Sequence, residues 1–99
     1  MKLLGSSIEK LLRNYNLWQG YQQYSLIEKW SGLVGPALAE VTRAEKVVNG
    51  VLRVAVKDSV WAYHLSMLKP QLIKKLNSHV GSRIVRDIYF YIDNLGKKD

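Results

Sequence analysis

Residues 41–56 read Val-Thr-Arg-Ala-Glu-Lys-Val-Val-Asn-Gly-Val-Leu-Arg-Val-Ala-Val, two β-rich runs on either side of Asn49-Gly50. An Asn-Gly pair in this setting is a strong hairpin signal, because both residues tolerate the positive φ angles of a type I′ turn. The pattern predicts strands over about 41–48 and 51–57. We expect them to form an antiparallel pair within a β-sheet.

The two-residue turn also predicts the register of this hairpin, with Lys46 opposite Arg53. Successive side chains of a strand point to opposite faces of a sheet, so the register sorts them into two sets. The set expected to face the core is Val47, Leu52, Val54 and Val56. The set expected on the other face is Lys46, Arg53 and Lys57. The sheet is therefore predicted to have one apolar face and one basic face.

Two helices are predicted before the hairpin. The first, over about 7–16, opens on a capping box from Ser6 to Glu9. The second, over about 20–34, carries apolar residues at helical spacing and ends near Gly35-Pro36, where glycine is a natural cap and proline disfavours continuation. Asparagines and a glycine between the two helices weaken helical continuity there.

A long helix is predicted after the hairpin. Asp58-Ser59 is a good N-cap pair, and apolar residues follow in steps of three or four from Trp61 to Val80. Pro70 lies inside this helix, where it removes a backbone hydrogen bond. We therefore expect either a kink or two helices that meet at Pro70.

Residues 83–92 read Arg-Ile-Val-Arg-Asp-Ile-Tyr-Phe-Tyr-Ile and predict a third strand, since β-branched and aromatic residues dominate. Alternation assigns the side chains to two faces. The inner face is expected to carry Ile84, Ile88, Phe90 and Ile92. The outer face is expected to carry Asp87, Tyr89 and Tyr91. Val85 fits poorly and suggests a bulge or burial of both faces near the start of the strand.

The element order is therefore α-α-β-β-α-β with a kink in the last helix. It indicates an α+β fold in which helices pack on one face of a three-stranded sheet. Residues 1–95 are predicted to form one domain and residues 96–99 a frayed tail. The length of 99 residues, with 47% hydrophobic and 23% charged residues, is that of one ordinary globular domain.

The composition limits the class of partner. Lysine and arginine outnumber aspartate and glutamate by 15 to 8, and this net charge of +7 favours phosphates or an acidic protein surface. The alternative is charge that only serves solubility. The absence of cysteine excludes disulfides and fits a reducing compartment. With no secretion signal and no apolar run of membrane-spanning length, we expect a cytoplasmic protein without a membrane partner.

The inventory for catalysis is thin. His64 and His79 have no carboxylates at ligand spacing, so no metal site is expected. Asp58, Ser59 and His64 invite comparison with a catalytic triad, but Asp and Ser are ordinary caps at a helix start. No phosphate-binding loop or dinucleotide fingerprint is present. We expect no enzyme activity, no catalytic residue and no cofactor.

The hairpin carries the first candidate nucleic-acid-binding residues. Lys46 directly opposite Arg53 is mildly destabilising unless an anion or a carboxylate offsets the two charges. Together with Lys57, and with Arg43 if the strand twists, this patch is suited to track a phosphate backbone. The alternative is a solvated strand face whose long side chains splay apart.

Lys74 and Lys75 are further candidates for nucleic-acid binding. With Lys69 they form a second basic stretch along the long helix. The alternative is an ordinary helix surface, since such surfaces are often rich in lysine.

Aromatic residues supply candidates for partner binding. Trp18, Tyr21 and Tyr24 follow one another at three-residue spacing, and such side chains can stack bases or anchor a protein. The favoured alternative is a junction where the first two helices pack. Tyr89 and Tyr91 stand on the outer face of the third strand, where they either stack bases or simply cover the sheet.

Three segments follow one another in an order and spacing that periodicity alone does not single out. They are Trp30-Ser-Gly-Leu-Val-Gly35, Gly50-Val-Leu-Arg-Val-Ala-Val56, and Asp58-Ser-Val-Trp61-Ala-Tyr-His-Leu65 running on to Leu76-Asn77. Together they resemble the DciA family of bacterial proteins. The resemblance extends from Trp30 to Phe90.

Resemblance to the DciA family implies a KH-like fold, binding to the replicative DNA helicase, and help in placing that helicase on single-stranded DNA. Many relatives carry a basic, flexible extension after the folded domain, whereas this sequence stops at Asp99, as a short member or a truncated chain would. Weak binding of single-stranded DNA is therefore expected.

The leading prediction is a DciA-like accessory of DNA replication that binds the replicative helicase and, more weakly, single-stranded DNA, and so assists helicase loading. Two alternatives stay open. One is a KH-like RNA-binding module that uses the same basic face, and the other is a protein-interaction adaptor without affinity for nucleic acid.

Overall fold

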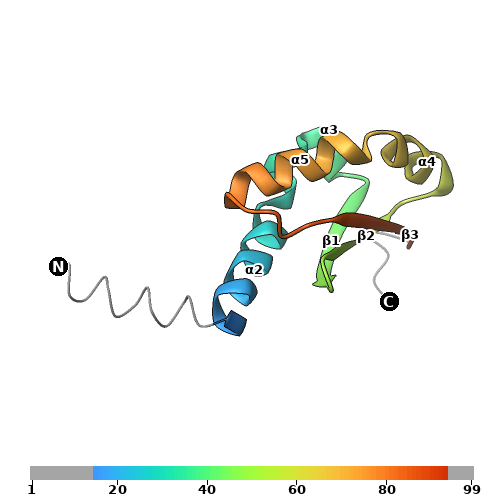
Figure 1. Ribbon diagram of the computed structural model, residues 1–99. Helices are drawn as coiled ribbons and strands as arrows, with labels where there is room; N and C mark the ends of the chain where they lie inside the picture. The colour runs from blue at the N-terminus through green and yellow to red at the C-terminus, as the bar shows by residue number, and fades with distance from the viewer. Residues whose placement is uncertain (1–14, 94–99) are drawn as a thin grey trace.

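The computed structural model describes residues 15–93. The elements are α2 (Tyr15–Val34), α3 (Pro36–Ala39), β1 (Thr42–Val48), β2 (Val51–Val56), α4 (Ser59–Met67), α5 (Lys69–Val80) and β3 (Asp87–Ile92) (Figure 1). The tail expected over 96–99 lies outside the described residues. So does the helix expected over 7–16, apart from positions 15 and 16, which belong to α2.

The sheet has the order β1-β2-β3 and is mixed, since β1 runs antiparallel to β2 while β3 runs parallel to it. The predicted hairpin register is confirmed, with Lys46 opposite Arg53 and Val47 opposite Leu52. Asn49 and Gly50 have φ angles of 51° and 81°, as a type I′ turn requires. The local turn chemistry therefore sets the pairing of the first two strands.

The helices cover one face of the sheet, as expected for the α+β class, and Figure 1 shows α3, α4 and α5 together on one side of the three strands. The core lies between these two layers. Its most deeply buried members are Leu26, Trp30, Leu52, Val54, Val56, Leu65, Leu76, Val85 and Ile88. The predicted inner side chains of β2 are all among them.

Trp30 ties α2 to the sheet through a chain of hydrogen bonds. Its buried indole Nε1 donates to Thr42 Oγ1 at 2.8 Å, and that hydroxyl donates to the Leu38 carbonyl oxygen at 2.7 Å. A buried indole N–H without a partner would cost free energy, so Thr42 is the residue that lets Trp30 sit in the core.

The helix break expected at Pro70 is confirmed as two separate helices that meet at Leu68. Pro70 lies in the first turn of α5, where its missing N–H leaves no intrahelical bond unmade. The predicted cap of α4 is also confirmed, because the Asp58 carboxylate accepts a hydrogen bond from the Trp61 amide at 3.0 Å. Trp61 itself is only half-buried against the core.

The expected break before residue 20 is wrong, because α2 runs unbroken from Tyr15. Gly20 is exposed within it and has the usual cost of a helical glycine, about 1 kcal/mol. Gln22, Leu26 and Trp30 lie one helical turn apart and are all buried. The packing of this face against the domain outweighs the weak local propensity.

The third strand begins at Asp87 and not at residue 83, so that prediction was wrong at its start. Val85 precedes the strand, and its backbone is held by the Asn77 side chain, which accepts from the Val85 amide at 2.9 Å and donates to its carbonyl at 2.8 Å. This explains why Val85 is buried out of phase with the strand. Ile92, expected on the inner face, is 58% exposed at the end of β3.

Replacing Gly50 with alanine tests the turn. The new methyl group would need a φ of +81° and would stand 2.7 Å from Arg86 Nε, so we expect Gly50→Ala to lower the free energy of unfolding by about 1–3 kcal/mol. Urea denaturation measures this. The matched control is Gly20→Ala, which has nothing within 4 Å and should be neutral or stabilising. Equal effects of the two substitutions would contradict the account of the turn.

Candidate nucleic-acid interface

The face of the sheet away from the helices carries several of the residues predicted to bind nucleic acid or a partner. The strand registers place Lys46, Arg53 and Tyr89 in one row across the three strands. They place Arg43 and Tyr91 in the next row, on either side of Ala55. We call this surface the basic-aromatic face, made of Arg43, Lys46, Arg53, Tyr89 and Tyr91. The sequence singled out all five residues and the Lys46–Arg53 pairing, but not the position of Tyr89 and Tyr91 beside β2.

A β-bulge in β1 brings Arg43 onto this face. Ala44 and Lys46 pair with adjacent residues of β2, which leaves Glu45 as the extra residue of the edge strand. In a regular strand, residues 43 and 46 would point to opposite faces, and the bulge removes that difference. The bulge, and not the expected twist of the strand, is the reason that Arg43 lies on the same face as Lys46 and Arg53.

Arg53 lies at the centre of the face, against two tyrosine rings. Its guanidinium carbon is 4.9 Å from the centroid of the Tyr89 ring and 5.4 Å from that of Tyr91. The two rings are stacked on each other, with centroids 6.1 Å apart and planes inclined by 22°. Cation–π attraction offsets part of the repulsion between Arg53 and the opposing Lys46.

Arg43 is held by two carboxylates. Its Nε donates to Glu45 at 2.5 Å, and its Nη2 donates to Asp93 at 3.1 Å. The hydrogen bond from Arg43 to Glu45 is the main reason that the pKa of this guanidinium is raised. Burial raises the pKa of the neighbouring Tyr91 hydroxyl. Arg43 therefore offers less free positive charge than Lys46 and Arg53, which form no ion pair with any residue that the structure describes.

Lys57 follows the last residue of β2 and is exposed. Its amide donates to the Val41 carbonyl at 2.9 Å, so the pairing with the β1 side continues one residue past the strand. Alternation along β2 then directs Lys57 to the same side as Arg53. Its place at the end of the basic-aromatic face agrees with the expected position.

Lys74 and Lys75 lie elsewhere. Both are exposed on α5, a helix that packs against α2 and β3 in the layer on the inner side of the sheet. The basic candidates therefore divide between two surfaces. Sequence reasoning missed Arg83 and Arg86, which share the surface of Lys74 around a groove. No periodic pattern marks these two arginines, because the segment before β3 is irregular.

The aromatic residues of α2 form a separate cluster. Trp18, Tyr21 and Tyr24 are 38%, 54% and 59% exposed, and the first two rings stack with centroids 5.9 Å apart. These three positions lie within one continuous helix, α2, while the partner helix of the expected junction, over 7–16, lies largely outside the described residues. Tyr24 donates to Glu28 at 2.8 Å, and this hydrogen bond raises the pKa of the Tyr24 hydroxyl.

The residues compared with a catalytic triad make contacts that serve the fold. Asp58 caps α4 as described, and His64 packs edge-on against Trp61 with ring centroids 5.8 Å apart. His79 Nε2 lies 3.4 Å from the Ser25 hydroxyl. Residues 15–93 contain no group of three or more His, Asp or Glu side chains that could hold a metal ion. Over the same range, no helix is both long and apolar enough to cross a membrane.

The fold and this surface together define a small α+β domain whose sheet leaves one face open, basic and aromatic. The profile of the family described as Dna[CI] antecedent, DciA matches residues 3–90, which is most of the chain. The chain therefore belongs to the DciA family, and the resemblance seen in the sequence is confirmed.

Similar curated proteins include several that are named as UPF0232 proteins. That of Mycobacterium bovis (strain BCG / Tokyo 172) is 28% identical over 85 residues, which cover 86% of this chain and 46% of the relative. That of Mycolicibacterium smegmatis is 29% identical over 84 residues, 85% of this chain and 43% of the relative. That of Corynebacterium glutamicum (strain R) is 24% identical over 88 residues, which cover 89% of this chain and 49% of the relative. The chain thus spans about half the length of these relatives.

A titration tests the charge balance at the start of β3. Lys69 Nζ lies 3.1 Å from Asp87 Oδ1, and the hydrogen bond from Lys69 is the main reason that the pKa of Asp87 falls below its ordinary value of 3.8. Lys69→Met should move the Asp87 midpoint, followed by NMR, back up towards 3.8.

The sign for stability follows from the same pair. The pKa of Asp87 is lower in the folded state than in the unfolded state. The ionised carboxylate therefore adds to the free energy of unfolding above pH 3.8, and this stabilisation is lost as the pH falls through the lowered pKa. The control is Lys75→Met on the same helix, which should leave the Asp87 midpoint unchanged. The pairing with Lys69 would be refuted by an Asp87 midpoint that is the same in wild type and Lys69→Met.

Proposed function

We propose that this protein is a DciA-like accessory of bacterial DNA replication that binds the replicative helicase and, weakly, single-stranded DNA, and so assists helicase loading. Membership of the DciA family supports a role related to helicase loading in general. The observation that carries the DNA part is Arg53, set between the exposed Lys46 and the stacked rings of Tyr89 and Tyr91 on the open sheet face.

Proteins that bind single-stranded nucleic acid commonly combine cations that contact phosphates with aromatic rings that stack on bases. The basic-aromatic face offers both. Lys46 and Arg53 can neutralise phosphates, and the exposed Tyr89 ring can stack on a base. In a duplex the bases are stacked on each other, so their flat faces are not available to Tyr89. We therefore propose that single strands bind better than duplexes.

The affinity should be low and sensitive to salt. Each neutralised phosphate releases counterions, so the number of free cations sets the slope of affinity against salt. Arg43 is already paired with Glu45 and Asp93, whereas Lys46 and Arg53 on this face and Lys57 at its end form no ion pair within residues 15–93. A surface with so few free charges is suited to transient contact.

The proposal also covers the setting in which the domain works. The profile match supports a DNA-replication protein of bacteria, and we propose the cytoplasm as its location, binding as its role rather than catalysis, and KH-like as the description of its fold. The curated relatives are about twice as long as the matched region. The helicase contact is therefore our proposal for this domain and does not rest on the whole length of those relatives.

Fluorescence anisotropy tests the basic part of the proposed face. Labelled oligothymidylate should bind more tightly than duplex DNA. Lys46→Glu with Arg53→Glu should weaken its binding by about tenfold or more, where each tenfold corresponds to ~1.4 kcal/mol. The double variant should also show a smaller slope of affinity against salt concentration. The control is Lys29→Glu with Arg83→Glu, the same change of net charge at exposed positions outside the predicted nucleic-acid-binding set. No binding at low salt would leave the adaptor alternative, and tighter binding of oligouridylate would favour the RNA-binding alternative.

Tyr89→Ala tests the aromatic part separately. Loss of base stacking should weaken oligothymidylate binding by about 1–3 kcal/mol while leaving the salt slope unchanged, because no phosphate contact is removed. The control is Tyr63→Ala, since Tyr63 is 72% exposed on α4 and lies outside the basic-aromatic face. If the Tyr63 variant loses as much affinity as the Tyr89 variant, stacking on β3 is not the mechanism.

A further inference from the structure

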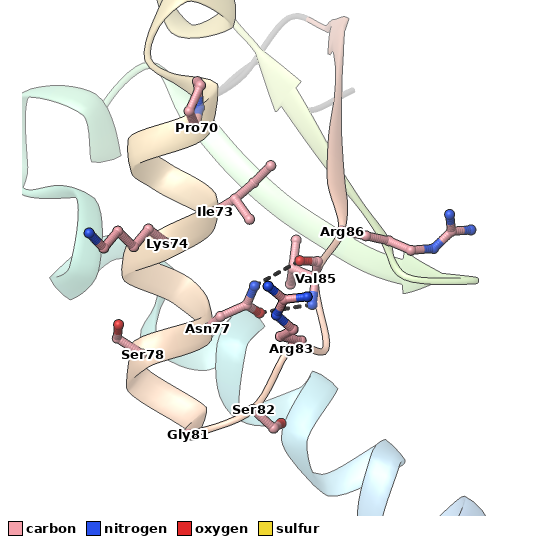
Figure 2. A pocket seen from close by; sticks show the side chains of 10 residues that line it. All are labelled: Pro70, Ile73, Lys74, Asn77, Ser78, Gly81, Ser82, Arg83, Val85 and Arg86. Carbon is pink, nitrogen blue, oxygen red and sulfur yellow. Dashed lines mark hydrogen bonds between the residues drawn. The ribbon is translucent and has the colours of Figure 1, made fainter.

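A groove of about 800 Å³ runs between α5 and the segment that leads from this helix to β3. Figure 2 shows its lining. Pro70, Ile73 and Val85 give it an apolar floor, while Lys74, Arg83 and Arg86 place cationic side chains around it. In this view Lys74 and Arg86 extend to opposite sides and Arg83 stands between them.

The walls of this groove are held in place before any ligand binds. Asn77 makes two hydrogen bonds to the backbone of Val85, and Gln22 of α2 donates to the Ser82 hydroxyl at 3.0 Å. The Arg86 guanidinium donates from Nε and Nη2 to the Asn49 carbonyl oxygen, at 3.0 and 2.7 Å. A groove fixed at both ends requires little ordering when a partner binds, which favours affinity.

Most of the positive charge around the groove is not neutralised by the described residues. Neither Lys74 nor Arg83 forms an ion pair within residues 15–93, and no aspartate or glutamate lines the groove. Arg86 bonds to a backbone carbonyl, which carries no net charge, and the nearby Asp87 carboxylate that interacts with it is itself paired with Lys69. Three cations around an apolar floor are complementary to carboxylates that flank an aliphatic side chain.

The lining favours a protein ligand over nucleic acid. None of the described residues that line the groove is aromatic, so a base entering it would find no stacking partner among them. The rings that can stack on bases lie on the other side of the sheet, at Tyr89 and Tyr91. We propose that this groove binds an acidic segment of a partner protein, with an aliphatic side chain seated on Ile73 and Val85 and its carboxylates facing Lys74, Arg83 and Arg86.

This inference goes beyond the proposed function, because it assigns a protein-binding site to a surface separate from the basic-aromatic face. The probe is a short fluorescein-labelled peptide of glutamates with central leucines, measured by anisotropy against the folded chain. We expect salt-sensitive binding that falls by about tenfold or more in Lys74→Glu with Arg83→Glu. The same peptide with glycines in place of the leucines should bind more weakly, because the apolar floor is left empty.

Two control measurements distinguish binding in the groove from binding at the proposed DNA site. The matched control, Lys29→Glu with Lys75→Glu, should bind the peptide as the wild type does, and amide shifts on adding peptide should fall in residues 73–86 and not in β2. Arg83→Glu alone, at a groove residue outside the predicted nucleic-acid-binding set, should still bind oligothymidylate within about twofold of wild type. Thermal melting confirms that each variant is folded.

The proposal is overturned if the wild-type chain does not bind the glutamate-leucine peptide at low salt, or if the groove variant binds it unchanged. An equal loss of peptide and oligothymidylate binding in Arg83→Glu would also overturn it, by making the groove part of the nucleic-acid surface. Failure of the wild type to bind oligothymidylate would instead refute the proposed DNA contact and leave the groove intact.

Discussion

The Asn49-Gly50 turn is the constraint on which both neighbours of β2 depend. Its positive φ angles fix the antiparallel register of β1, and its carbonyl oxygens receive the chain that enters β3. The Gly50 carbonyl accepts from the Arg86 amide at 2.8 Å, while the Asn49 carbonyl accepts from the Arg86 side chain. One tight turn thus positions the antiparallel and the parallel strand pairs, although residues 49 and 86 are far apart in the chain.

The registers then determine the chemistry of the open face. Because β3 is parallel to β2 and in fixed register with it, Tyr89 and Tyr91 lie beside Arg53 and Ala55. Ala55 is small and fully buried between Arg43 and Tyr91, so the larger neighbours close over it. The bulge at Glu45 adds Arg43 to the same face and at the same time supplies a carboxylate that pairs with it. The face therefore gains an arginine but little free charge from it.

The two basic surfaces differ in the ligand that their physical chemistry suits. On the sheet, cations lie beside flat aromatic rings, a combination that fits the phosphates and bases of a single strand. In the groove beside α5, cations surround an aliphatic floor, which fits carboxylates and branched side chains. Under the two proposals, one domain would contact a single strand on its sheet and a protein segment in its groove.

Local physical chemistry was enough to predict the hairpin, its register, the cap at Asp58 and the helix break at Pro70, since each depends on residues adjacent in sequence. The tyrosines of β3 were assigned to the outer face by alternation alone. Contacts between distant residues decided the rest: buried packing carried α2 through Gly20, and Asn77 held Val85 out of β3. The bulge at Glu45 and the groove formed by Lys74, Arg83 and Arg86 belong to the same class, because neither exists until separate elements pack together.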